Sequence, residues 1–195
     1  MQGVNRIILA SASTTRRDLL KKAGVSFRVV ESAYRERFDA TKTPRRLAKH
    51  LAYQKAYRVA KKHPSALVIG ADTLMVLDRK TFGKPRSVRE HRTMLKRMSG
   101  RTHTMITGVA IVGLRSGARK IFCRETRVTF RRLSDKEIAA YAESGEGKIA
   151  AGGYRIQRGA KKFVRRIRGN IDTVIGLPVQ DTLRALRVAG ARTPV

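Results

Sequence analysis

Apolar runs alternate with amphipathic stretches along the chain, and this alternation predicts strands separated by helices. Five apolar runs have the length and composition of strands: 7–10, 27–30, 66–77, 104–114 and 120–130. The third is unusually long, and we expect it to break near Gly70-Ala71-Asp72, because glycine weakens a strand. The last two flank Arg115-Ser116-Gly117, which has the composition of a turn.

Amphipathic segments between these runs predict the helices. Five are expected, at about 16–23, 44–62, 88–98, 134–144 and 178–189. Pro44 suits the first turn of a helix, and Ser134-Asp135-Lys136-Glu137 has the pattern of a capping box. There is no repeat, low-complexity segment or long linker, so we expect a single domain over 1–195. The pattern predicts an α/β fold, with a mixed sheet in which at least two strands are antiparallel and helices flank the sheet.

The charge of the chain indicates an anionic partner. It has 195 residues, of which 44 are Lys or Arg and 14 are Asp or Glu, giving a net charge of +30 at pH 7. Hydrophobic residues make up 42%, which excludes a disordered basic tail. Nucleic acid and a nucleotide substrate both fit such a charge, and so does a basic surface with no specific partner. The basic residues are scattered in pairs, and no dense basic arm stands out.

Other residue classes exclude several kinds of protein. A single cysteine, Cys123, excludes an internal disulfide framework and a cysteine-based zinc finger. The four histidines, His103 among them, lack metal-ligand spacing and are expected to be structural or surface residues. The N-terminal apolar run, 7–10, is too short for a signal peptide's apolar region, and no run reaches the length of a membrane span. We expect a soluble, cytoplasmic protein that has no membrane partner.

Asp72 is the strongest candidate for a catalytic or metal-binding residue. It is the one charge in the twelve residues of 66–77. A buried carboxylate must be paired or must hold a metal. The position of Asp72 therefore predicts one of two roles. The carboxylate either caps a turn at a strand end or lies at the mouth of a sheet. In the second case it acts as a general base on water or as a metal ligand.

A hydroxyl-rich loop precedes the first helix. Ser11-Ala12-Ser13-Thr14-Thr15 follows an apolar strand and leads into Arg16-Arg17. Backbone N–H groups at a helix N-terminus attract phosphate, and arginine adds paired donors. Ordinary capping of the helix by Ser13 or Thr14 is the simpler interpretation. The loop lacks the glycines and the Gly-Lys pair of a Walker loop.

Two lysines are weaker candidates. Lys55 borders the apolar stripe of the segment 44–62, where it either snorkels to solvent or faces a site. Lys84 stands in the turn Gly83-Lys84-Pro85. Glu36 lies in a charged loop and, by itself, is a solvated carboxylate.

Together these segments resemble the Maf family of nucleoside triphosphate pyrophosphatases. The resemblance covers about 8–189, nearly the whole chain, and rests on motifs in a fixed order. They are Leu9-Ala10-Ser11-x-Ser13 with Arg16-Arg17, Leu51-Ala52-x-x-Lys55-Ala56, Gly70-Ala71-Asp72-Thr73, Gly83-Lys84-Pro85, Met98-Ser99-Gly100-Arg101-Thr102-His103, Thr107-Gly108-Val109, Gly152-Gly153-Tyr154-x-Ile156-Gln157 and Val174-Ile175-Gly176-Leu177-Pro178. Each motif is weak alone, whereas eight in order are specific.

The resemblance implies a fold like that of inosine triphosphatases, with two lobes around a cleft. It implies hydrolysis of a nucleoside triphosphate to the monophosphate and pyrophosphate, aided by a divalent metal cation, Mg²⁺ or Mn²⁺. It makes Asp72 the proton acceptor. The chemistry of this hydrolysis, which needs a metal and a positioned water, lets Asp72 with Glu36 hold either the metal or the water. The resemblance assigns substrate binding to Ser11, Ser13, Arg16, Glu36, Lys55 and Lys84, and base selection to Thr15, Thr73 and Gln157. The alternative is a basic protein that keeps the fold and binds nucleic acid. The sequence leaves open whether the protein forms a homodimer.

The chain departs from the family pattern at a few positions. Thr14 stands where the family usually has proline, and Ile149-Ala150 replaces an Asp-Lys pair, with Lys148 nearby. Thr73 with Gln157 resembles members that prefer dTTP and UTP. Thr15 followed by two arginines resembles the loop spacing of members that act on 7-methyl-GTP. We weight the two base-side residues more, and expect pyrimidine triphosphates.

Overall fold

The computed structural model of the protein describes residues 6–34, 39 and 41–194. Seven strands are present in this part of the chain: β1 (Ile7–Leu9), β2 (Arg28–Val29), β3 (Leu67–Leu77), β4 (Lys80–Phe82), β5 (Thr102–Gly113), β6 (Ala118–Phe130) and β7 (Val164–Arg168). The α-helices are α1 (Thr14–Lys22), α2 (Pro44–Lys62), α3 (Val88–Met98), α4 (Asp135–Glu143), α5 (Ile171–Ile175) and α6 (Val179–Val188). Three short 3₁₀ helices, Glu146–Ile149, Ala151–Gly153 and Gly159–Phe163, connect α4 to β7.

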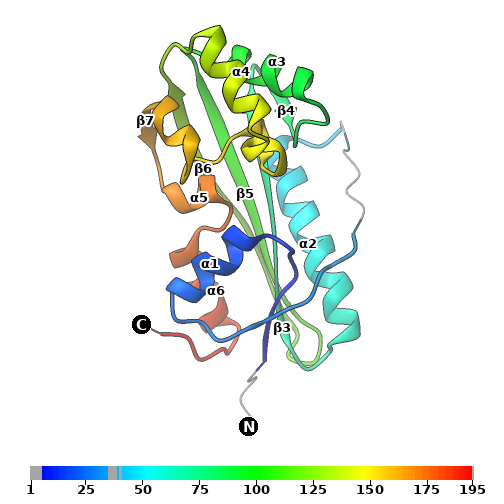
Figure 1. Ribbon diagram of the computed structural model, residues 1–195. Helices are drawn as coiled ribbons and strands as arrows, with labels where there is room; N and C mark the ends of the chain where they lie inside the picture. The colour runs from blue at the N-terminus through cyan, green and yellow to red at the C-terminus, as the bar shows by residue number, and fades with distance from the viewer. Residues whose placement is uncertain (1–5, 35–38, 40, 195) are drawn as a thin grey trace. The chain divides into compact units, whose positions relative to one another are not determined.

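The strands form one mixed sheet in the order β2-β1-β3-β5-β6-β7, with β4 paired to β3 (Figure 1). β1 is parallel to both β2 and β3, whereas β3–β4 and β6–β7 are antiparallel. The fold class expected from the sequence, a mixed sheet with flanking helices, is therefore confirmed.

The chain divides into two compact units. The first comprises Met1–Asp72, Thr107–Arg124 and Gly176–Val195, and the second comprises Thr73–Ile106 and Glu125–Ile175. The boundary falls directly after Asp72, so the candidate residues of the sequence are distributed over both units.

The first unit has three layers. Alternate residues of β1, β3 and β5 face opposite sides of the sheet. Ile7, Leu9 and Ile69 pack with α1 and α6, while Ile8 and Val68 pack with α2. Since both faces are covered by helices, the strands are almost continuously apolar, as is typical of buried parallel strands (Figure 1).

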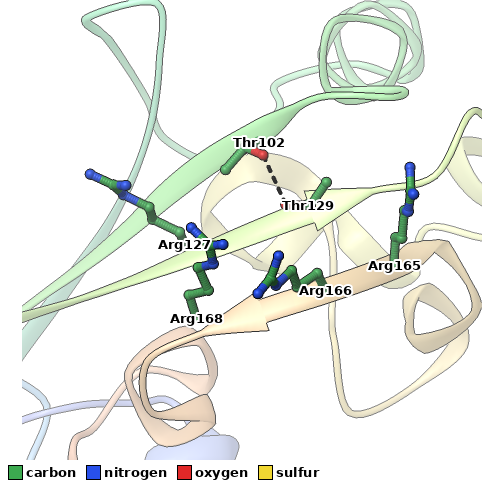
Figure 2. A pocket seen from close by; sticks show the side chains of 6 residues that line it. All are labelled: Thr102, Arg127, Thr129, Arg165, Arg166 and Arg168. Atoms are coloured by element: carbon green, nitrogen blue, oxygen red, sulfur yellow. Dashed lines mark hydrogen bonds between the residues drawn. The ribbon is translucent and has the colours of Figure 1, made fainter.

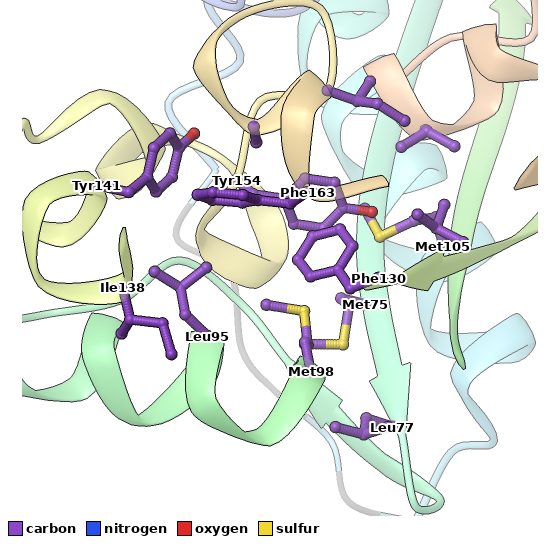
Figure 3. Packing of buried hydrophobic residues seen from close by; sticks show 14 of the residues in the cluster. Met75, Leu77, Leu95, Met98, Met105, Phe130, Ile138, Tyr141, Tyr154 and Phe163 are labelled. Atoms are coloured by element: carbon purple, nitrogen blue, oxygen red, sulfur yellow. The ribbon is translucent and has the colours of Figure 1, made fainter. Parts of the chain in front are cut away.

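The second unit has its own core on one face of its strands. Met75, Met105 and Phe130 project from the sheet toward Leu95 of α3 and Tyr141 of α4 (Figure 3). Tyr154 and Phe163, from the connecting segment, complete an aromatic cluster. On the opposite face, Arg127 and Arg168 are exposed.

Several sequence predictions are confirmed, and one is wrong. α2 has the predicted bounds, and Ser134 and Glu137 form the predicted capping box. The expected break near Gly70-Ala71-Asp72 does not occur, because β3 runs without interruption from Leu67 to Leu77. A helix packs closely against Gly70, as described below, and this contact explains why a glycine stands within the strand. The strands β4 and β7 and the helix α5 were not predicted from the sequence.

His103 is a structural residue, as its sequence context predicts. It is buried in the second unit, where its Nε2 lies 2.8 Å from the hydroxyl of Tyr154 and its ring meets the ring edge of Phe130. Burial lowers the pKa of His103 from 6.5 to about 4. The imidazole is thus neutral at physiological pH. No helix of the described residues is long and apolar enough to cross a membrane.

Candidate active site

A loop between β1 and α1 forms the first part of the site. Ser13 has an extended backbone and is the N-cap of α1, where its Oγ accepts a hydrogen bond from the Arg16 amide at 3.4 Å. Oγ of Ser13 also lies 2.9 Å from Oγ1 of Thr15. The capping role expected for Ser13 is confirmed. The first turn of α1 contains no acidic residue, so the positive end of the helix dipole is not neutralised there.

Arg16 fastens this loop to a distant segment of the first unit. Its Nε donates to the carbonyl of Gly176 at 2.8 Å, and its Nη1 donates to Oγ of Ser11 at 3.2 Å. The backbone amide of Ser13 donates to the same Oγ at 3.2 Å. Gly176 belongs to one of the motifs in the sequence, but the sequence assigned it no role. The arginine thus orders the loop as well as adding positive charge to it.

Asp72 and Lys55 form the second part of the site. Asp72 is the sixth residue of β3 and lies on the face that packs against α2. Nζ of Lys55, from α2, lies 2.5 Å from Oδ1 of Asp72. Asp72 is 4% exposed and Lys55 is 9% exposed. The prediction that Asp72 is paired is therefore confirmed, and Lys55 does not snorkel to the surface.

Gly70 allows this contact. A Cβ atom at Gly70 would lie 2.2 Å from the carbonyl oxygen of Ala52 and 2.7 Å from the amide nitrogen of Ala56. On the neighbouring strand β5, a Cβ at Gly108 would lie 2.3 Å from the carbonyl oxygen of Ala48. The backbone of α2 therefore rests directly on two glycines, and this close approach brings Lys55 within reach of Asp72.

We expect Gly70→Ala to damage both stability and activity. The added methyl group clashes with backbone atoms of α2. Because backbone atoms cannot move aside by a change of rotamer, the whole helix must move. Overpacking of this kind costs about 1–3 kcal/mol of unfolding free energy. Chemical denaturation measures the loss, and turnover in the same preparation reports the displacement of Lys55. An unchanged denaturation midpoint with unchanged turnover would contradict the close approach.

The strand register places the two parts of the site side by side. β1 and β3 are parallel, with Leu9 opposite Ile69, and the Ala10 amide donates to the Ile69 carbonyl at 2.8 Å. Continued by two residues, this register sets Ser11 level with Ala71, next to Asp72. The loop thus begins at the carboxyl end of β1, the end at which open parallel sheets bind ligands.

The remaining candidate site residues do not belong to the described part of the first unit. Thr73, Lys84 and Gln157 belong to the second unit, where Thr73 is half-buried and the other two are exposed. Glu36 lies outside the described residues. Lys148 and Ile149, near the missing Asp-Lys pair, are exposed in the second unit. The structure therefore unites Lys55 and Asp72 beside the loop of Ser11, Ser13, Thr15 and Arg16.

The donor set around Asp72 suits a metal that arrives with phosphate. Among residues 6–34, 39 and 41–194, no cluster of three or more His, Cys, Asp or Glu side chains is placed to hold a metal. A single carboxylate is nevertheless sufficient for Mg²⁺, which keeps waters and completes its octahedron with substrate phosphates. The carboxylate of Asp72 is a hard oxygen donor of the required kind.

A mixed α/β sheet in which the parallel strand β1 leads into a helix-capping, arginine-fastened loop beside a buried carboxylate has the features of an α/β enzyme. The model of the family described as Maf-like protein matches residues 6–189. The chain belongs to the Maf family.

Curated relatives match over almost the entire chain. A dTTP/UTP pyrophosphatase of Bacillus pumilus is 38% identical over 187 residues, which cover 96% of this chain and 98% of the relative. A protein of the same name from Akkermansia muciniphila is 40% identical and covers 95% of this chain and 97% of its own. One from Deinococcus radiodurans is 42% identical, with coverages of 95% and 93%.

The fold is also found among solved structures. The Ham1 protein of Staphylococcus aureus superposes with a TM-score of 0.50 at 13% identity, covering 96% of this chain and all of the other, 100%. At this level of identity the likeness concerns the fold alone.

Proposed function

We propose that the protein hydrolyses nucleoside triphosphates to the monophosphate and pyrophosphate. The observation that carries this proposal is the buried Asp72–Lys55 pair beside a loop suited to phosphate. The curated relatives, which are named dTTP/UTP pyrophosphatases, support the same activity. The reaction is expected to take place within a single domain, 1–195, in the cytoplasm, where nucleoside triphosphates are made and used.

In the proposed reaction a water oxygen attacks the α-phosphorus, and the bond from that phosphorus to the bridging oxygen breaks. Pyrophosphate leaves with the electron pair of that bond. Asp72 accepts the proton of the water, since a carboxylate held within hydrogen-bond reach is a competent general base. Lys55 orients the carboxylate through its contact with Oδ1.

The loop and the remaining cations bind the substrate. Amide groups at the start of α1 are proposed to hold phosphate oxygens, together with Ser11, Ser13 and Arg16. Lys84 and Glu36 are proposed as further substrate-binding residues. Because charge develops on the leaving pyrophosphate, fixed N–H donors and cations there stabilise the transition state more than the ground state.

Asp72 and Glu36 are proposed to hold a divalent metal cation, Mg²⁺ or Mn²⁺. When bound, such a cation neutralises phosphate charge and polarises the phosphorus under attack. Lys55 already contacts one oxygen of Asp72, so the metal is expected to depend on the substrate's phosphates for further ligands.

Base selection is assigned to Thr73 and Gln157, with Thr15 as a third position. The amide of Gln157 offers one acceptor and two donors, which suits the carbonyl and N–H edge of uracil or thymine. We expect kcat/KM for dTTP and UTP to exceed that for 7-methyl-GTP, because a base that leaves these groups unpaired loses several kcal/mol. A higher kcat/KM for 7-methyl-GTP than for both pyrimidines would show that the loop at Thr15, and not Gln157, reports the substrate.

A panel of nucleoside triphosphates, each with Mg²⁺ or Mn²⁺, tests the activity by the release of pyrophosphate. Pyrophosphate and monophosphate in equal amounts support the proposal. Release of orthophosphate from the γ-position would indicate a phosphatase and overturn it. The alternative function, a protein that keeps the fold and only binds nucleic acid, is disfavoured by the pairing of Asp72 with Lys55, because a site for nucleic acid phosphates has no use for a buried carboxylate.

A further inference from the structure

Four arginines and two threonines line a hollow on the exposed face of β5, β6 and β7. The hollow has a volume of about 470 Å³ and is lined by Thr102, Arg127, Thr129, Arg165, Arg166 and Arg168 (Figure 2). We call it the arginine pocket. All its residues belong to the second unit, and none is a candidate for the pyrophosphatase site.

Strand alternation explains how most of these side chains come to one face. Val128 and Phe130 of β6 point into the core, so Arg127 and Thr129 point away from it. In the antiparallel pairing, Arg127 lies opposite Arg168 and Thr129 lies opposite Arg166. Thr102 of β5 joins them through a hydrogen bond of 2.8 Å between its Oγ1 and that of Thr129.

A β-bulge adds the fourth arginine. The register shifts between Thr129 and Phe130, whose partners are Arg166 and Val164, so Arg165 has no partner on β6. In a regular strand, neighbouring residues face opposite sides of the sheet. The extra residue of a bulge breaks this rule and re-aims a side chain, so that Arg165 and Arg166 both line the pocket.

Within the described part of the chain, no carboxylate balances the charge of the arginine pocket. All four arginines are exposed, and none forms an ion pair with a carboxylate of the described residues. Other arginines in or next to β6 do have such partners: Arg124 within the strand pairs with Asp181, and Arg131, directly after it, pairs with Glu137. Placing Arg127 directly opposite Arg168 is destabilising for the sheet, since like charges repel across a strand pair. An anion that binds both would offset this cost.

We propose that the arginine pocket binds the phosphate backbone of double-stranded nucleic acid without regard to sequence. Guanidinium groups bind phosphate oxygens in pairs, and threonine hydroxyls add neutral donors of the kind that contact the backbone. Arg166 and Arg168 are two residues apart on one strand, about 6.6 Å. This spacing suits successive phosphates of one chain better than a single small anion. The proposal goes beyond the pyrophosphatase activity and does not depend on it.

The lining residues favour a duplex over a single strand. Proteins that hold single strands stack the unpaired bases on aromatic side chains. The lining of the arginine pocket includes no aromatic residue. A duplex keeps its bases stacked on one another and presents phosphates outward, which is the part that arginine and threonine recognise. The net charge of +30 would add long-range attraction for such a polyanion.

The test measures binding of a short mixed-sequence DNA duplex by fluorescence anisotropy, over salt concentrations from about 50 to 200 mM. Arg166→Ala with Arg168→Ala should lower the affinity at low salt at least about tenfold. It should also reduce the slope of log Kobs against log salt by about two, one for each phosphate that the variant no longer neutralises. Lys61→Ala with Lys62→Ala removes the same charge from an exposed site at the end of α2 and should leave the slope unchanged.

Further variants and competitors distinguish a duplex site from diffuse attraction by the basic surface. Arg166→Lys with Arg168→Lys keeps the charge and should keep the slope. The proposal would be overturned if Arg166→Ala with Arg168→Ala had the same slope as Lys61→Ala with Lys62→Ala. It would also be overturned if the wild type did not bind the duplex at low salt. Tighter binding of the single strand, or full displacement of the duplex by tripolyphosphate at equal phosphate concentration, would overturn the duplex assignment. Pyrophosphate release is measured on the same proteins and should be unaffected by the arginine substitutions.

Discussion

Asp72→Asn is expected to lower kcat for the best nucleoside triphosphate by at least about 100-fold, the usual effect of losing a general base. The substitution keeps the shape of the side chain, and the amide oxygen still accepts a hydrogen bond from Nζ of Lys55. It removes the capacity to take a proton from water.

Asp78→Asn is the matched control. Asp78 also belongs to the β3 region of the chain, but it is exposed in the turn after the strand and pairs with Arg97 and Arg101 at the surface. Its φ of 50° is one that asparagine tolerates well. The control should keep both turnover and fold. If Asp72→Asn retained near-normal turnover, Asp72 would not be the base.

The sequence predicts the layers of this fold better than its details. Apolar periodicity locates α2 and β3 because burial imposes the pattern directly. The strand β7 escapes notice because Val164–Arg168 contains three arginines, and its pairing with β6 depends on a partner more than thirty residues away. The break expected at Gly70 is wrong for a related reason. Glycine weakens a strand in isolation, but here the missing side chain is required by the backbone of a helix, which is a tertiary contact that no local pattern contains.

The same limit applies to the site. A lone charge in an apolar run was enough to identify Asp72 as paired or ligated, since the energetic cost of burying a carboxylate holds in any fold. The partner could not be identified from the sequence, because Lys55 on an amphipathic helix is equally compatible with solvent. The arginine pocket was missed altogether. Its residues come from three strands, and a bulge that the sequence does not mark brings Arg165 to the same face.

The second large effect concerns stability. Lys55→Met is expected to lower the free energy of unfolding by about 3–5 kcal/mol, because it leaves the carboxylate of Asp72 in a buried position without the ammonium at 2.5 Å. Methionine keeps most of the apolar stem that packs in α2, so the loss reflects charge more than a cavity. Unfolding in denaturant, followed by circular dichroism and by tyrosine fluorescence, measures the change. Coincidence of the two signals establishes that the two units unfold together.

The double variant Lys55→Met with Asp72→Asn distinguishes an ion pair from mere packing. If the charges are coupled, the second substitution removes the buried carboxylate charge that has lost the ammonium of Lys55, and the double variant should be more stable than Lys55→Met alone by a few kcal/mol. If Lys55 acted only through its stem, the effects of the two substitutions would add. Additive effects would contradict the ion pair. They would also remove the argument that Lys55 orients the base, because a lysine that does not stabilise the carboxylate of Asp72 has no means of holding it toward the water.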